Sequence, residues 1–200
     1  IYDKKTIDLA GTWLSRSFYS GTFKDNTLGS KPAEIPYIGT GLIRKDFIDR
    51  WGYLFDNDYF FYGEDVDLGL RIRLMGYKVY YIPDSIVYHA GSMSRRVHKP
   101  SYLTFLMERN LMRTFYQTMS VKSIMKFKIY GLLMRIIAII KDILTLNIGN
   151  AFARLKAILW MIFNIVKVFR KRNEVQKMRK VKDEELLKHF SEKHLWSRII

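Results

Sequence analysis

One segment constrains the fold of this chain more than any other: an aromatic run and a glycine, followed by acidic residues and an apolar stretch. The residues concerned are, in order, 59–62, Gly63, Glu64, Asp65 and Asp67. The apolar residues behind them, between positions 68 and 75, predict a helix that ends in a left-handed cap at Gly76. Acidic residues at a helix start interact favourably with the helix dipole, which is one interpretation of the cluster. The other is catalytic: an aromatic run is costly to expose and predicts a cleft, where a carboxylate accepts a proton from a bound hydroxyl.

Further motifs surround this segment. They are a glycine-bearing loop with a strand after it over 39–45, the segment 51–56, the strand-like segment 76–83, His89 with Gly91 and Ser92, and the sequence Glu108-Arg109-Asn110. With the acidic segment, this ordered set resembles the family 2 glycosyltransferases of the GT-A fold, in particular the rhamnosyltransferase-like enzymes of surface polysaccharide assembly. The resemblance extends over residues 6–117.

The resemblance implies an α/β fold, namely the C-terminal part of a GT-A (Rossmann-like nucleotide-diphospho-sugar transferase) domain followed by an α-helical C-terminal region. We place the acceptor-side, catalytic part of that domain in residues 1–120 and a basic, apolar helical extension in residues 121–200. The implied activity is inverting transfer of a sugar from a nucleotide-diphosphate sugar to a glycan or lipid-linked acceptor in polysaccharide or glycoconjugate assembly.

The resemblance also implies roles for single residues. Asp65 would be the general base, and Glu64 would orient the acceptor or that base. His89 would complete the site of a divalent metal ion, Mg²⁺ or Mn²⁺. Acceptor or donor binding would fall to Gly39, Thr40, Gly41, Tyr62, Arg95 and Arg96. Local sequence alone leaves other interpretations open: a structural histidine, a solvated basic loop over 95–99, and a β-bulge at the two glycines.

The family's nucleotide-binding half, with its parallel βαβ strands and Asp-x-Asp metal motif, has no counterpart in these residues. Asp56 and Asp58 have the Asp-x-Asp spacing, but they follow the glycine-bearing loop, whereas the metal motif should precede it. We therefore leave them unassigned and expect a fragment that carries the acceptor half of the site and does not bind the donor sugar unaided. Two hypotheses from other classes stay open: a non-catalytic pseudoenzyme that docks on another transferase subunit, and a basic membrane- or partner-binding module.

Positive charge is concentrated in the C-terminal two-fifths of the chain. Residues 121–200 hold 18 Lys and Arg against 6 Asp and Glu, which accounts for +12 of the net charge of +15. Such a segment predicts an anionic partner. Because the basic residues of 124–144 and 155–169 alternate with apolar rather than polar residues, an anionic membrane surface is favoured over nucleic acid.

The longest uncharged run in this region, residues 143–153, has 11 residues, fewer than the about 20 that a membrane-spanning helix needs. Helices lying in the membrane interface, together with Trp160, are one interpretation, and a helical hairpin packed on the catalytic part is the other. The first predicts a cytoplasmic protein held peripherally on the inner face of the cell membrane. The lack of cysteine in all 200 residues excludes disulfides and cysteine-based zinc sites.

Local patterns predict several further elements. Expected are a helix capped by Asp46 and closed at Gly52, strands over 77–82 and 85–89, a helix over 102–119 and a final exposed helix over 183–197. We also expect Asp67 to pair with Arg71 one helical turn later, and Glu108 to pair with Arg113 or with the neighbours of Arg109.

Overall fold

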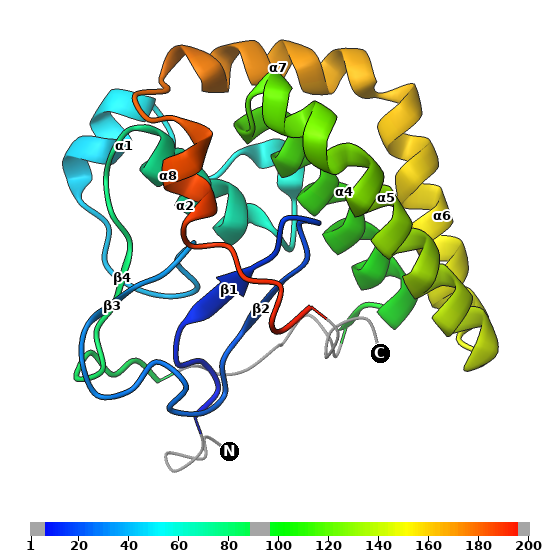
Figure 1. The fold of residues 1–200 in the computed structure, drawn as a ribbon, viewed down its shortest axis with the longest axis horizontal. Helices are drawn as coiled ribbons and strands as arrows, with labels where there is room; N and C mark the ends of the chain where they lie inside the picture. The colour runs from blue at the N-terminus through cyan, green and yellow to red at the C-terminus, as the bar shows by residue number, and fades with distance from the viewer. Residues whose placement is uncertain (1–6, 89–96, 196–200) are drawn as a thin grey trace.

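The computed structural model describes residues 7–88 and 97–195, and helices make up most of this part of the chain (Figure 1). The strands are β1 (Thr12–Leu14), β2 (Ser20–Thr22), β3 (Ala33–Glu34) and β4 (Tyr80–Tyr81). The helices are α1 (Lys45–Trp51), the short 3-10 helix η1 (Asn57–Tyr59), α2 (Glu64–Leu74), α4 (Pro100–Thr118), α5 (Val121–Leu144), α6 (Ile148–Phe163), α7 (Ile165–Lys177) and α8 (Asp183–Leu187).

The strands form two small antiparallel sheets, in which β1 pairs with β2 and β3 pairs with β4. The expected α/β class is therefore met only loosely, because the described residues contain no parallel sheet of the Rossmann kind. Two segments predicted as strands differ from expectation. The one over 77–82 is reduced to β4, and residues 85–88 are irregular.

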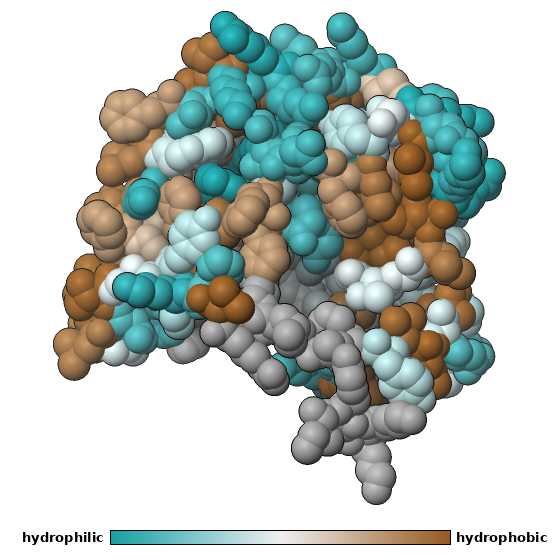
Figure 2. Space-filling view, turned by 180° about the vertical axis from the view of Figure 1, so that it is seen from behind, coloured by the Kyte–Doolittle hydropathy of each residue, from teal (hydrophilic) through white to brown (hydrophobic). Residues whose placement is uncertain are grey.

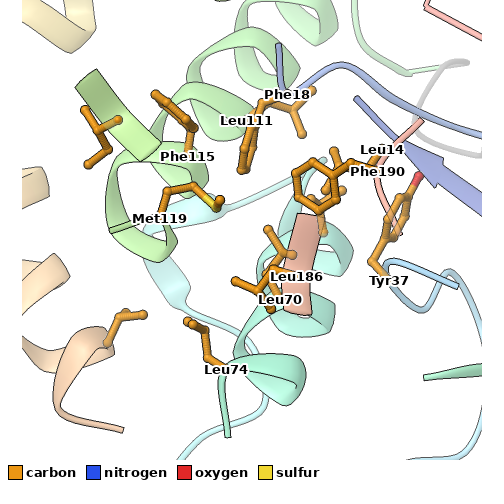
Figure 3. Packing of buried hydrophobic residues seen from close by; sticks show 13 residues of the cluster. Leu14, Phe18, Tyr37, Leu70, Leu74, Leu111, Phe115, Met119, Leu186 and Phe190 are labelled. Atoms are coloured by element: carbon orange, nitrogen blue, oxygen red, sulfur yellow. The ribbon is translucent and has the colours of Figure 1, made fainter. Parts of the chain in front are cut away.

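Helix α2 forms the centre of the molecule, and every residue from Val66 to Leu74 on it is buried. Figure 3 shows Leu70 and Leu74 packed among apolar side chains from α4, from the β1 region and from the C-terminal segment. The glycine at position 69 allows one further neighbour to come close. A Cβ built there would lie 2.4 Å from the backbone of Tyr37, so the chain at Tyr37 can rest directly on the helix.

The helices after residue 120 pack on the rest of the molecule: α6 and α7 contact α4, α5 contacts α6, and α8 contacts α2. Helix α6 runs along both α4 and α5, and α7 crosses α4 (Figure 1). This packing is the one that the hairpin interpretation predicts, and it leaves apolar residues on the outer sides of α5 and α6 exposed. None of the described helices is long and apolar enough to cross a lipid bilayer.

A buried ion cluster joins these helices. Glu108 on α4 pairs with Arg135 on α5 at 3.1 Å and with Arg154 on α6, and it accepts a hydrogen bond of 2.9 Å from the hydroxyl of Tyr19. Arg154 also pairs with Asp142 at 2.8 Å. The expected pairing of Glu108 with Arg113 is wrong, because residues five apart on a helix point in different directions.

Most predicted helix boundaries are close to the observed ones. Helix α1 ends at a left-handed Gly52 as expected, and the residue after α2 and Met75 is a left-handed Gly76. Asp46, however, is not the N-cap of α1. Arg44 occupies that position, and the Asp46 carboxylate instead accepts hydrogen bonds from Arg44 and from the hydroxyl of Tyr77, each at 3.0 Å.

The final helix is also shorter than predicted. Within residues 183–195, the described part of the predicted segment, only α8 is helical, and it is not simply exposed, since Asp183 and Leu186 are buried. After it the chain runs beside β1, where the amide of Ser191 donates a hydrogen bond of 2.8 Å to the carbonyl of Leu14. Tertiary packing of the C-terminal segment therefore replaces the expected helical turns.

Removal of the central charge should weaken the whole helix layer. We expect Glu108→Gln to lower the free energy of unfolding by about 3–5 kcal/mol, because it leaves two buried guanidinium groups with one carboxylate between them. Urea unfolding measures the change. Glu185→Gln is the matched control: its exposed pair with Lys188 (2.7 Å) should contribute less than about 0.5 kcal/mol. A cost for Glu108→Gln no larger than that of the control would contradict a stabilising role of the cluster.

Candidate active site

The acidic motif lies at the start of α2, after a loop with an unusual backbone. Phe60 and Tyr62 have positive φ values of 59° and 61°, and Gly63, at 82°, is the N-cap of the helix. Non-glycine residues rarely adopt this left-handed conformation, and it persists only where the surroundings enforce it. The aromatic run is divided by this path, with Tyr59 buried, Phe60 exposed, and Phe61 and Tyr62 half-buried.

Helix α4 supplies the groups that hold the loop in this conformation. The side-chain amide of Asn110, which is fully buried, donates hydrogen bonds to three successive turns of the loop backbone: the carbonyls of Tyr59 (3.0 Å), Phe61 (2.9 Å) and Tyr62 (2.5 Å). The guanidinium of Arg109 donates a further bond of 3.0 Å to the carbonyl of Tyr59. The Arg-Asn pair noted in the sequence thus fixes the loop that presents the acidic residues.

Glu64 and Asp65 occupy the first turn of α2 and interact with few partners. One carboxylate oxygen of Asp65 accepts a hydrogen bond of 2.8 Å from the amide of Val66. Oε2 of Glu64 is buried and has no hydrogen-bond partner among the described residues. Burial raises the pKa of Asp65 to about 7, and the neighbouring charge of Glu64 adds to this effect. Burial also raises the pKa of Glu64. A carboxylate with a pKa close to neutrality is well suited to accept and release a proton.

Asp67 has a different environment and a structural role, as expected. It is buried and pairs with Arg71 at 2.7 Å, one helical turn later, and the hydroxyl of Tyr59 donates to it at 3.2 Å. The guanidinium of Arg71 lies 4.9 Å from the ring centres of both Trp51 and Tyr53. Asp67 therefore anchors α2 to the segment that precedes the motif.

The glycine-bearing loop is only partly as predicted. Gly39, Thr40 and Gly41 are exposed in an irregular segment, so neither the expected strand after them nor a β-bulge is present. The chain just before them rests on Gly69 of α2, which lies one turn after Asp65 on the same side of the helix. The loop therefore begins close to the face of α2 that carries Asp65.

Three predicted site residues, His89, Arg95 and Arg96, lie outside the described residues. His98 follows this segment, and its ring centre lies 6.0 Å from that of Phe61. His98, Tyr102 and Lys156 line a cavity of about 420 Å³ at the N-terminal end of α4. Phe61 of the aromatic run therefore contacts His98, one of the residues that line this cavity.

The Asp-x-Asp sequence is occupied by cations of the protein itself. Arg113 pairs with Asp56 at 3.1 Å and with Asp58 at 3.0 Å, and Lys167 and Lys171 of α7 approach the same carboxylates at 3.1 and 3.8 Å. Within residues 7–88 and 97–195, no group of three or more His, Cys, Asp or Glu side chains is placed to hold a metal ion. The two aspartates join η1 to α4 and α7, which supports leaving them out of the predicted site.

The sequence marks Asn110 only as part of the Glu108-Arg109-Asn110 motif and assigns it no role in the site. The available signal was a short polar amide side chain inside a helix that also carries two arginines. Its hydrogen-bond partners could not be inferred, because the loop lies 48 to 51 residues earlier in the sequence. Comparisons with protein-family models, with curated proteins and with solved structures find no significant match to this chain. The functional argument therefore depends on the residues and their geometry.

The raised pKa of Asp65 should appear as a pH dependence of stability. The folded protein holds this proton up to about pH 7, whereas the unfolded chain loses it near the ordinary value of 3.8. Because the folded state binds more protons in this interval, the free energy of unfolding should fall as the pH rises from about 4 to 7. Asp65→Asn should remove most of this fall and be more stable than the wild type at pH 8. Urea unfolding at several pH values measures it.

Asp84→Asn, at an exposed loop carboxylate, is the control and should unfold with the pH dependence of the wild type. An Asp65→Asn protein that loses stability between pH 4 and 7 as steeply as the wild type would show that Asp65 titrates normally.

Asn110 should be required for the order of the loop. Asn110→Ala removes a donor from three loop carbonyls, of which that of Tyr59 keeps its bond from Arg109 while those of Phe61 and Tyr62 lose theirs. This change should cost about 1–3 kcal/mol of unfolding free energy. Hydrogen exchange followed by mass spectrometry should accelerate in residues 59–64 and stay unchanged in α6. Asn164→Ala is matched in chemistry, since the Asn164 amide bonds only the carbonyl of Trp160 in its own helix (2.9 Å). Equal exchange of the loop in both variants would argue against the assigned role of Asn110.

Proposed function

We propose that this chain carries the acceptor side of an inverting, GT-A-type glycosyltransferase of family 2. The substrate would be a nucleotide-diphosphate sugar, and the acceptor a glycan or a lipid-linked glycan precursor in polysaccharide or glycoconjugate assembly. The observation that carries the proposal is the paired carboxylate at the start of α2, where burial and Glu64 raise the pKa of Asp65 to about 7. The ordered motifs of the sequence support the same family.

In the proposed reaction, Asp65 accepts the proton of the acceptor hydroxyl while that oxygen attacks the anomeric carbon of the donor sugar. The new carbon–oxygen bond forms on the face opposite the leaving group, and the bond to the diphosphate oxygen breaks, so the configuration inverts. Asp65 is left protonated and the nucleoside diphosphate leaves with the bonding electron pair. The role of Glu64 is to keep the proton affinity of Asp65 high and to offer its unpartnered oxygen to an acceptor hydroxyl.

Donor-side chemistry is proposed from the resemblance alone. Arg95 and Arg96 would offset the charge of the departing diphosphate, and His89 would be one ligand of Mg²⁺ or Mn²⁺. The described residues do not assemble a metal site around these expectations, so no step of the reaction is routed through the metal. Gly39, Thr40, Gly41 and Tyr62 are proposed to border the acceptor and donor.

The proposed location is the inner, cytoplasmic face of the cell membrane, to which the protein binds peripherally. A lipid-linked acceptor would be reached most directly there, and the basic, apolar helices α5 and α6 suit such a surface. The second candidate function, a non-catalytic membrane- or partner-binding module, is favoured by the same exposed apolar helices and does not need Asp65.

Transfer activity separates the two candidates. The assay uses the natural protein that contains these residues, labelled nucleotide-diphosphate sugars, membrane extracts as acceptor source, and Mg²⁺ or Mn²⁺. Asp65→Asn should lower the rate by about 10²–10⁴-fold, because the amide keeps the shape of the carboxylate and cannot accept the proton. The wild-type rate should increase as the pH rises through about 7, because Asp65 ionises there.

Asp84→Asn is the control and should stay within a few-fold of the wild type. If Asp65→Asn retains wild-type activity, the base is another residue. If the wild type transfers none of the sugars, the non-catalytic module becomes the better function.

A further inference from the structure

Helices α5 and α6 each expose a continuous apolar stripe. On α5 the stripe includes Met125, Ile129, Leu132, Leu133, Ile136 and Ile140, and on α6 it consists of Ile148, Phe152, Leu155, Leu159, Ile162 and Phe163. Both sets recur every three or four residues, so each follows one side of its helix. Figure 2 shows hydrophobic residues along the edge of the molecule where these helices lie. A surface of this extent marks an interaction site in a folded protein.

A groove connects the two stripes and shows that they share one face. It has a volume of about 300 Å³, within the range of ligand-binding clefts. Ile129 and Leu132 of α5 line one side, Ile158 and Ile162 of α6 line the other, and Met112 of α4 contributes to its lining from beneath. Three of these residues belong to the exposed stripes, so the stripes and the groove form a single surface, here called the α5–α6 face.

The charge of the same helices is almost entirely positive. Residues 121–163 contain seven Lys and Arg and one acidic residue, Asp142. Asp142 and the two arginines, Arg135 and Arg154, belong to the interior cluster with Glu108, so the remaining charge of these helices is that of five lysines. Lys122, Lys126 and Lys128 form no ion pair with any residue that the structure describes. Lys128 also lines the groove, at the side of α5.

Trp160 does not belong to this face, contrary to the expectation from sequence. Its ring is half-buried, and the guanidinium of Arg109 on α4 lies 5.4 Å from the ring centre. The exposed aromatic side chains of α6 are instead Phe152 and Phe163. Hydrophobic insertion would therefore depend on these phenylalanines and on the aliphatic residues of the stripes.

We propose that the α5–α6 face binds the surface of an anionic lipid bilayer, with both helices lying in the interface and the groove receiving part of an acyl chain. This rests on the peripheral membrane location in the proposed function and does not depend on glycosyl transfer. Positive charge at the margin of an apolar face complements anionic headgroups. A second copy of the chain fits less well, since two such faces would bring like charges together.

Vesicle flotation tests the proposal with the full chain. Vesicles of equal parts phosphatidylglycerol and phosphatidylcholine should bind the wild type, and vesicles of phosphatidylcholine alone should bind it less. High salt should weaken binding without abolishing it, because salt screens the lysines and leaves apolar burial intact. Replacement of Lys122, Lys126 and Lys128 by Gln should reduce binding to anionic vesicles by about tenfold or more and leave binding to neutral vesicles unchanged.

A pair of doubly substituted proteins locates the binding face. Ile129→Glu with Ile162→Glu changes two residues of the stripes that are 62% and 60% exposed. Ile86→Glu with Val87→Glu makes the same change in charge and hydrophobicity at residues 75% and 57% exposed outside the α5–α6 face. The first protein should bind anionic vesicles about tenfold or more weakly than the second. Circular dichroism should show the wild-type helix content in both.

Equal binding of the two proteins, or no binding of the wild type, would overturn the proposal. Light scattering without vesicles adds a second check: a wild-type dimer that the Ile129→Glu, Ile162→Glu change converts to monomer, with no vesicle binding, would make the face a protein interface. Asp65→Asn should float like the wild type. A variant that loses transfer but still floats with vesicles would therefore be impaired in the catalytic site alone. A variant that no longer floats but still transfers sugar would be impaired in the α5–α6 face alone.

Discussion

The arrangement of the helices depends on the ion pairs that the buried carboxylate of Glu108 forms. Glu108 lies in the middle of α4 and forms ion pairs with Arg135 of α5 and Arg154 of α6. It also accepts a hydrogen bond from the hydroxyl of Tyr19, which lies between β1 and β2. Two positive and two negative side chains share this interior, since Asp142 pairs with Arg154. Such a cluster is costly to form and far more costly to break, because each unmatched charge would remain away from water. It also specifies which faces of three largely apolar helices meet.

The same helix fixes the candidate site through the next residues in sequence. Glu108 points to the helix layer, while Arg109 and Asn110 hold the loop before α2. The loop backbone adopts left-handed conformations at two aromatic residues, and the hydrogen bonds from Asn110 make that path stable. As a result Glu64 and Asp65 stand together in a partly buried first turn. Proximity and burial, rather than a special partner, are the causes of the raised pKa of Asp65.

Local patterns predicted what local physics determines. The acidic start and glycine end of α2, the extent of α4, the Gly52 cap and the Asp67–Arg71 pair all depend on neighbours within one helical turn. The partners of Glu108 could not be found in this way, because Arg154 is 46 residues distant and Tyr19 is 89. The strand predicted over 77–82 was too long for a related reason. A strand lasts only as long as its partner, and β3, the partner of β4, has two residues.

The close contact at Gly69 has a consequence for how the glycine-bearing loop is positioned. Glycine inside a helix lowers helix stability by about 1 kcal/mol relative to alanine. Here it also allows the backbone at Tyr37 to pack directly against α2. The carbonyl of Tyr37 also accepts a bond of 2.6 Å from Thr12, and its hydroxyl donates at 2.9 Å to the carbonyl of Gly21. The distance between the glycine-bearing loop and the helix that carries Asp65 thus depends on the absence of a side chain at position 69. Any larger residue there would push the chain at Tyr37 away from α2.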